Sequence, residues 1–286
     1  MKSKSYLFFL FLILLFFIPL LFLIPEKKKK TILFTNVRDE THIREWIDHH
    51  FLIGFDFIYI FDHMSTIPVS TLVHGQDNIK IDRIDHDFSP EFNKLTLINK
   101  AVDYAKTNNY EWMLYLDGDE FLYLRDDTTI DDFLKKYGNV DQIGINWLLF
   151  GSNYLETEPP GIRNYYTKSN RFLDRHVKSF VKPSCVEKSV NPHYYLLVDG
   201  TKTVAWDGNE FHGPFYGEGI QIDKNRCNAY VAHYFSQCYD VYKKRKIGRT
   251  RDDIPGAKWD NILPKEKFHE ENNEMENTDL KKYISI

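Results

Sequence analysis

The chain lacks the features that build several common classes of protein. Its 286 residues include 3 cysteines, 14 glycines and 11 prolines, which excludes a disulfide-stapled scaffold and a collagen-like or low-complexity chain. Cys185, Cys227 and Cys238 allow at most one disulfide bond, and the absence of a CxxC pair leaves a metal or redox motif without support. No GxxxxGK sequence followed by Ser or Thr occurs either, which counts against P-loop nucleotide chemistry.

Net positive charge is also missing. The formal charge is -4 and the isoelectric point is about 6.3, which argues against nucleic acid as a partner. The first 30 residues contain six lysines and one acid, Glu26, so the acidic excess lies in residues 31–286. An acidic body on a basic, apolar stem is typical of a tethered enzyme or receptor.

The apolar run from Tyr6 to Pro25 is long enough to cross the hydrocarbon core of a bilayer. Pro19 lies within it and should kink the helix. A cleaved signal peptide is the alternative, but no small-residue cleavage motif follows the run. We therefore predict a single-pass signal-anchor that makes the lipid bilayer a partner through residues 6–25.

The orientation of this anchor stays open. Lys27 to Lys30 outnumber Lys2 and Lys4, which by charge alone keeps the carboxyl side cytosolic, although long downstream domains can translocate regardless. No Asn-x-Ser/Thr sequon occurs in residues 31–286 to indicate a lumenal face. We divide the chain into a tail (1–5), the anchor (6–25), a basic stem (26–30), one domain with two halves (31–140 and 141–250) and a polar C-terminal tail (251–286).

The domain alternates short apolar strands with helical stretches. Alternation of this kind predicts an α/β fold with a mostly parallel central sheet flanked by helices. We expect strands at 31–37, 57–61, 79–84, 112–116 and 142–150, and helices at 40–52 and 91–106.

Polar residues follow three of these strands, at Asn36–Glu40, at Asp62 with His63, and at Asp117–Glu120. Ligands of such sheets bind beyond the carboxyl ends of the strands. Asp117 and Asp119 flank Gly118 in a DxD sequence, and two carboxylates on a tight turn can hold Mg²⁺ or Mn²⁺ beside a substrate phosphate. Alone, this pattern is more often an acidic turn in solvent.

Three segments carry a resemblance to a known family. They are TNVRDETHIREWIDHHFLIGFDFIYIFDH (35–63), WMLYLDGDEFL (112–122) and HYFSQCYDVYKKRKIGR (233–249). Together they resemble glycosyltransferase family 92 and its family 2 relatives, which share the GT-A nucleotide-sugar fold. The resemblance covers about residues 31–250.

The resemblance implies a role for individual residues. Asp119 would bind the metal directly, Asp117 would lie nearer the ribose or a metal-bound water, and His233 would complete the metal shell. A satisfied core histidine is the alternative for His233. The implied nucleotide-sugar contacts are Thr35, Asn36, Val37, Arg38, Glu40, Asp62, Asp117 and Lys178, and the implied phosphate contacts are Lys243, Lys244 and Arg245.

The sequence departs from the family pattern at Asp39, His63, Gln237 and Cys238. The family's known members invert the anomeric centre, which needs a carboxylate to take the acceptor proton. Glu187, Asp207 and Glu210 are the candidates for this base, and the sequence does not choose among them.

The resemblance predicts a membrane-anchored glycosyltransferase, dependent on Mn²⁺ or Mg²⁺, whose catalytic domain lies in the lumen of the secretory pathway. It would move a hexose, galactose by family analogy, from a UDP-sugar to a hydroxyl of a glycan or glycoconjugate acceptor. A metal-dependent nucleotidyl or phosphoryl transferase is one alternative. The other is a non-catalytic glycan-binding protein that keeps the fold.

Overall fold

The computed structural model describes residues 30–73, 75–247, 249–251, 257–258 and 262–284. None of the helices in these ranges has the length and apolarity that a bilayer crossing requires. The predicted anchor at 6–25 lies outside the described residues.

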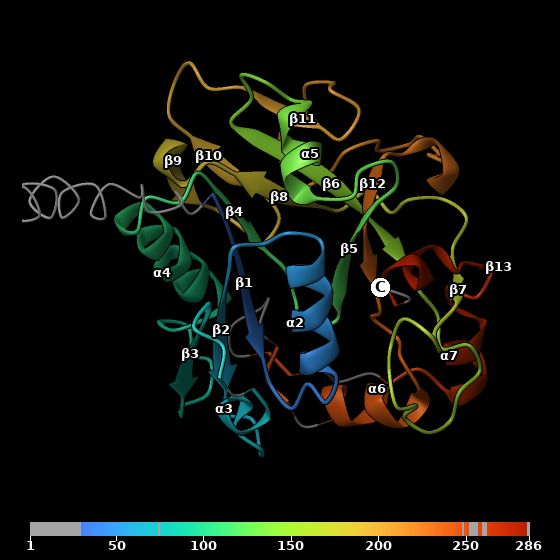
Figure 1. Cartoon of the computed structure of the whole chain (residues 1–286). Coiled ribbons are helices and arrows are strands. Elements are labelled where there is room, and N and C mark those ends of the chain that lie inside the picture. The colour runs from blue at the N-terminus through green and yellow to red at the C-terminus, as the bar shows by residue number, and fades with distance from the viewer. Residues whose placement is uncertain (1–29, 74, 248, 252–256, 259–261, 285–286) are drawn as a thin grey trace, which may run out of the picture.

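A mixed sheet curls through the molecule with the strand order β3-β2-β1-β4-β8-β6-β12-β5, and β11 pairs with β6 (Figure 1). Its strands are β1 (Thr31–Val37), β2 (Phe57–His63), β3 (Ile79–Ile84), β4 (Trp112–Tyr115), β5 (Glu120–Leu124), β6 (Gln142–Leu149), β8 (Val177–Val181), β11 (Thr203–Ala205) and β12 (Ala229–His233). The predicted strands at 31–37 and 79–84 are confirmed to the residue, and the others to within two residues.

The first half of the sheet is parallel, as predicted, because β3, β2, β1 and β4 all run the same way. The prediction of a mostly parallel sheet is wrong for the second half. There β8 runs antiparallel to both β4 and β6, and β5 runs antiparallel to β12. Between β6 and β12 the chain forms no α-helix, so loops rather than helical crossovers connect these strands and neighbours can run in opposite directions.

Helices α2 (Ile43–Leu52) and α4 (Lys94–Thr107) cover opposite faces of the parallel strands. On β1, Leu33 packs in the cluster of α2 whereas Ile32 and Phe34 pack in the cluster of α4. Burial on both faces explains why β1 and β2 read as continuous apolar runs. Helix α4 begins three residues later than the predicted 91, because Asn93 caps it and forms a capping box with Thr96.

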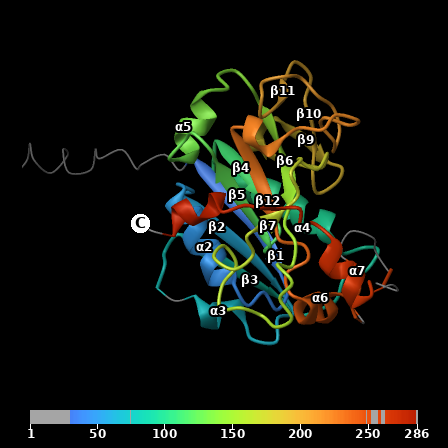
Figure 2. The ribbon, with the colours of Figure 1, turned by 90° about the vertical axis from the view of Figure 1, so that its right-hand side faces the viewer.

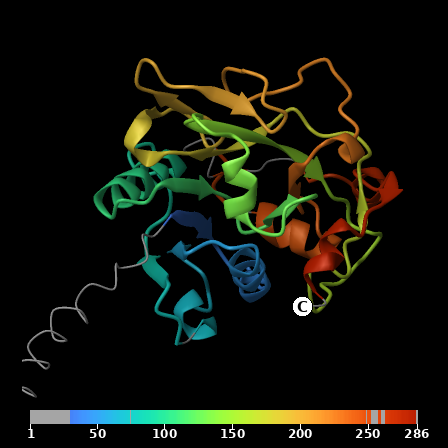
Figure 3. The same ribbon diagram turned by 45° about the horizontal axis from the view of Figure 1, so that its top comes forward.

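The shorter elements surround this sheet. Figure 2 shows α6 (Tyr239–Lys246) beside α7 (Lys265–Glu270), and in Figure 3 the yellow segments lie at the top, away from the blue strands of the first half. The remaining elements are α3 (Val69–Leu72), α5 (Ile130–Lys135), β7 (Lys168–Ser169), β9 (Val186–Ser189), β10 (Tyr195–Leu197), β13 (Met275–Glu276) and the 3-10 turns η1 (Pro183–Cys185), η2 (Lys224–Arg226) and η3 (Asp279–Tyr283).

The segment after residue 250, predicted to be a polar tail, packs onto the body in its described part. Strand β13 pairs with β7, and Leu280 and Tyr283 join the main core cluster. The Tyr283 hydroxyl accepts from the amide of Leu124 at 3.1 Å, which ties the C-terminal residues to β5. The three cysteines are unpaired, with Cys227 and Cys238 buried.

Candidate functional site

A cavity of about 310 Å³ opens at the carboxyl ends of β1 and β4, where α6 closes it. This is the edge at which the sequence predicts ligand binding. Its lining includes eight of the predicted site residues: Asn36, Val37, Arg38, Glu40, Asp117, Asp119, His233 and Arg245. Five basic side chains share the lining, namely Arg38, Lys94, Arg245, Lys246 and Arg249.

The acidic turn between β4 and β5 packs tightly against the end of β1. A Cβ atom added to Gly118 would lie 2.7 Å from Cγ1 of Val37, so a residue with a side chain does not fit without movement. The amide of Glu120 donates to the carbonyl of Asp117 at 3.0 Å and closes the turn. Asp117 and Asp119 are thereby presented at the cavity, as predicted.

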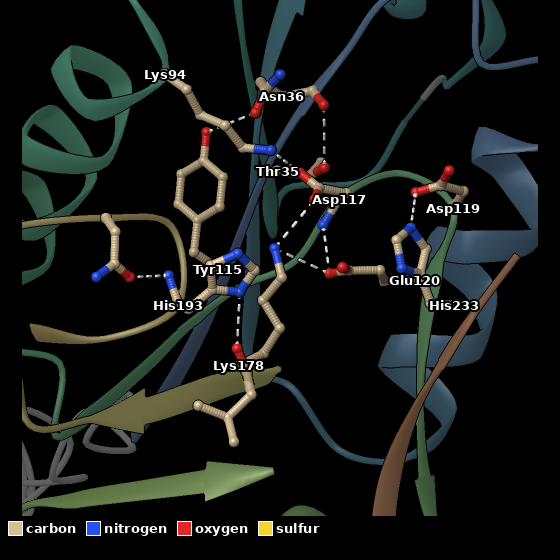
Figure 4. A network of polar contacts seen from close by, with 12 residues as sticks. Thr35, Asn36, Lys94, Tyr115, Asp117, Asp119, Glu120, Lys178, His193 and His233 are labelled. Carbon is tan, nitrogen blue, oxygen red and sulfur yellow. Dashed lines mark hydrogen bonds and ion pairs between the residues drawn. The ribbon is translucent and has the colours of Figure 1, made fainter. Parts of the chain in front are cut away.

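Two lysines bind the Asp117 carboxylate (Figure 4). Nζ of Lys94, the first residue of α4, lies 2.5 Å from Oδ1, and Nζ of Lys178 on β8 lies 3.0 Å from Oδ2. Burial alone would raise the pKa of Asp117, but the two lysine charges outweigh it and hold this pKa well below its usual range. Asp117 is therefore ionised and fully engaged by protein cations.

Lys178 does not face the cavity as the family pattern implies. Its side chain is fully buried, and its second ion pair reaches Oε2 of Glu120 at 3.2 Å. Burial raises the pKa of Glu120, and the charge of Lys178 opposes that rise. The placement of β8 between β4 and β6 brings Lys178 to the acidic turn, where it contacts both Asp117 and Glu120.

Arg245 on α6 binds the other side of the turn. Its Nη1 lies 2.6 Å from Oδ2 of Asp119, and its Nη2 contacts Oε2 of Glu40. Burial raises the pKa of Glu40 to about 7, and the neighbouring guanidinium opposes that rise. Arg245, a phosphate contact by the family resemblance, lines the cavity.

His233 lies beside Asp119 because β12 pairs with β5 in the register that sets His233 opposite Glu120. Its Nε2 is 3.7 Å from Oδ1 of Asp119, and its buried Nδ1 has no hydrogen-bond partner among the described residues. Burial lowers the pKa of His233 to about 4, and the nearby aspartates oppose the shift. A neutral imidazole with an unused nitrogen fits a ligand-binding histidine better than a satisfied core residue.

A divalent cation fits part of the predicted ligand set. In the described residues, no group of three or more His, Cys, Asp or Glu side chains is arranged around a metal position. Asp119 and His233 face each other across a gap that a cation could bridge, whereas both oxygens of Asp117 bind lysines. A cation held by Asp119 and His233 would take its remaining oxygens from a bound phosphate or water.

Besides Lys178, two other predicted nucleotide contacts lie outside the cavity lining. Thr35 is fully buried within β1. Asp62 is also buried, where it accepts from the amides of Ser65 and Val69 and pairs with Arg83 at 3.0 Å. Asp62 therefore organises the loop after β2 instead of lining the site.

The three predicted base candidates also lie outside the cavity lining. Glu187, Asp207 and Glu210 are exposed, and Asp207 accepts from the hydroxyl of Tyr216 in its own loop. The carboxylates among the described lining residues are Glu40, Asp117 and Asp119.

The structure adds residues that sequence reasoning did not find. Lys94 lies in the chain between the first and second of the family segments, and Arg249 is the last residue of the third, but the sequence assigned neither of them a role. Arg249 binds Asp39 at 2.7 Å, and the left-handed backbone of Asp39 (φ 55°) suits Asp or Asn better than most residues. Of the departures from the family pattern, His63 lines the cavity and Asp39 binds the lining residue Arg249. Gln237 and Cys238 are buried just before α6.

A sequence profile of glycosyltransferase family 92 matches residues 31–283. The chain belongs to glycosyltransferase family 92. The resemblance noted from the sequence is thus confirmed, and the matched region of this family 92 chain extends through the C-terminal residues that pack onto the body.

Two curated relatives carry the same family name. A glycosyltransferase family 92 protein of rice is 25% identical over 73% of this chain and 33% of its own length. One of Ricinus communis is 24% identical over 79% of this chain and 39% of its own. The family 92 chain thus spans well under half the length of these relatives.

A solved structure, HddC from Yersinia pseudotuberculosis, is similar at a TM-score of 0.32 with 8% identity. The match covers 62% of this chain and 90% of that one.

Proposed function

We propose that this chain is a glycosyltransferase with the GT-A fold, which moves a hexose from a UDP-sugar to a hydroxyl of a glycan or glycoconjugate. The observation that carries the proposal is a cavity in which an acidic DxD turn meets five basic side chains. Fixed cations around a small cavity suit a diphosphate. Family membership supports the reaction class.

In this proposal the end of β1 receives the nucleoside, through Asn36, Val37 and the backbone near Arg38. Arg245 and Arg249 extend from and beyond α6 toward the same cavity and offset the charge of the diphosphate. The Lys94 and Lys178 charges hold Asp117 in place, so the turn keeps its shape when the donor enters.

The proposal includes Mn²⁺ or Mg²⁺, held by Asp119 and His233. Such a cation would neutralise the departing diphosphate. Inversion, with a carboxylate accepting the proton of the acceptor hydroxyl, and galactose as the hexose come from the family resemblance. The apolar run at 6–25 supports a single-pass membrane protein. The proposal places the catalytic domain on the lumenal side, near secretory acceptors, by family resemblance.

Calorimetric titration of UDP into the full chain in detergent micelles, with and without Mn²⁺, tests the proposal. We expect UDP to bind with the metal, and Asp119→Asn to abolish that binding, while Asp207→Asn on an exposed loop binds as the wild type does. A folded wild type that ignores UDP, GDP and other nucleotides, yet binds glycans, would contradict the proposal and favour a non-catalytic glycan-binding protein.

A further inference from the structure

The lining of the cavity combines cationic and aromatic side chains. The cations include Arg245, Lys246 and Arg249, and the rings include Trp147, His193 and Phe235, with Nζ of Lys246 4.3 Å from the ring of Phe235. His233 connects Trp147 to the acidic turn, since its ring is 4.4 Å from that of Trp147 and its Nε2 faces Asp119. A ligand that fills the cavity therefore has one charged part and one part that accepts aromatic contact.

Trp147 differs from the other described tryptophans. Trp46, Trp112 and Trp206 are buried, whereas Trp147 on β6 is only partly buried and lines the cavity. Its backbone is fixed on both sides, because its amide donates to His176 and its carbonyl accepts from Asp174. An indole this firmly placed at a cavity is more suited to ligand contact than to filling the core.

Neighbouring rings set the orientation of the Trp147 side chain. The ring of His176 stacks on it at 5.0 Å with an angle of 27°, and the ring of His193 meets it edge-on at 5.0 Å. His193 is itself fixed by a 2.9 Å contact from Nδ1 to the carbonyl of Val177. The indole is thus held before any ligand arrives, and little conformational entropy is lost when one binds.

Two ring nitrogens at this end of the cavity lack partners. Nε1 of Trp147 and Nδ1 of His233 are buried without a hydrogen-bond partner among the described residues. Buried polar atoms of this kind are normally satisfied. An aromatic surface with adjacent unused polar groups matches a pyranose, which presents C–H groups on its face and hydroxyls on its rim.

Position distinguishes the donor sugar from the acceptor. In a nucleotide sugar the pyranose is bonded directly to the terminal phosphate, so it must lie next to the phosphate site. Trp147 is in contact with His233, and His233 faces Asp119 at the phosphate end. We propose that Trp147, with the unpaired nitrogens of Trp147 and His233, forms the subsite for the hexose of the donor, and that Trp147 sets donor specificity. This inference rests on the proposed function.

The test compares UDP with UDP-galactose, UDP-glucose and UDP-N-acetylglucosamine by calorimetry, on the full chain in detergent with Mn²⁺. We expect the wild type to bind one UDP-hexose more tightly than UDP. Trp147→Leu should lower the affinity for that UDP-hexose by about tenfold and leave the affinity for UDP unchanged. Trp147→Phe, which keeps the aromatic face but loses the N–H, should bind the UDP-hexose with an intermediate affinity. If the leucine variant does not fold, the phenylalanine variant tests the subsite.

Arg249→Gln is the reciprocal control, because it should weaken UDP and the UDP-hexose equally. A leucine variant that keeps the full preference for the UDP-hexose overturns the subsite while the proposed function stands. Equal wild-type affinity for UDP and every UDP-hexose overturns it too. A wild type that binds no nucleotide overturns the proposed function, and this inference with it.

Discussion

Arg245 and Asp119 form an ion pair, with Nη1 2.6 Å from Oδ2, although 126 residues separate them in the chain. Because the same guanidinium contacts Glu40, a single side chain of α6 joins the acidic turn to the segment after β1. Ion pairs of Arg245 thus join α6 to the acidic turn at the cavity.

Replacing Arg245 should damage both stability and ligand binding. Arg245→Gln leaves Glu40 and Asp119 close together without their cation, so we expect the free energy of unfolding to fall by about 3 kcal/mol and the affinity for UDP to fall at least about tenfold. Urea denaturation and calorimetry measure the two effects. Arg171→Gln removes an ion pair with Asp223 in which the arginine side chain is 62% exposed. The free energy of unfolding of this control should fall by less than about 1 kcal/mol. Equal losses for both variants would contradict this reading.

Substitution of Asp117 should mainly affect stability, whereas substitution of Asp119 should mainly affect ligand binding. Asp117→Asn removes one partner of the fully buried Lys178, so the free energy of unfolding should fall by about 3 kcal/mol. Asp119→Asn leaves Arg245 paired with Glu40 and should cost about 1 kcal/mol, while it abolishes the UDP binding that depends on Mn²⁺. Denaturation and titration of both variants check this. The reverse order of stabilities would assign the structural role to Asp119.

Acid should destabilise the protein through two buried histidines of α2. His49 donates through Nε2 to the carbonyl of Leu122 and His50 donates through Nδ1 to that of Trp46. Burial lowers the pKa of His50 to about 3 and that of His49 well below 6.5. Below pH 6.5 the unfolded chain therefore binds more protons than the folded one, so stability is full above that pH and is lost as the pH falls toward 3.

Between pH 7 and pH 5, each of these histidines should lower the free energy of unfolding by about 2 kcal/mol. Denaturant unfolding across this range measures it. His50→Gln lowers stability at pH 7 but should flatten the dependence on pH, whereas Ile47→Val in the same helix should give a curve parallel to the wild type. Parallel curves for all three proteins would refute the assignment.

The C-terminal residues should be required for stability. Tyr283→Phe removes the acceptor of the Leu124 amide, and an unsatisfied buried amide should lower the free energy of unfolding by about 2 kcal/mol. Tyr154→Phe changes a residue that is 55% exposed and should stay within about 0.5 kcal/mol of the wild type. Thermal and urea unfolding compare them. A Tyr283→Phe protein as stable as the wild type would separate this segment from the core.

Much of the first half of the fold could be predicted because its signals are local. The strands at 31–37 and 79–84 follow from short apolar runs, and the acidic turn follows from its place after β4. The mixed second half of the sheet could not be predicted. There β8 pairs antiparallel with β4 and β6, and no local sequence pattern links these segments. Lys178 was predicted to contact the nucleotide sugar because the position of β8 in the sheet was not predicted. In the structure β8 places it in a buried ion pair with Asp117.

The sequence by itself determined the apolar run at 6–25, the alternation of strands and helices, and the order of the acidic, histidine and basic motifs. Only the tertiary structure decided which charges meet. Lys94, Lys178 and Arg245 reach the acidic turn across 23, 61 and 126 residues of chain. Coulombic attraction and hydrogen bonding act over a few ångströms in space, so such partners emerge only when strands and helices have packed.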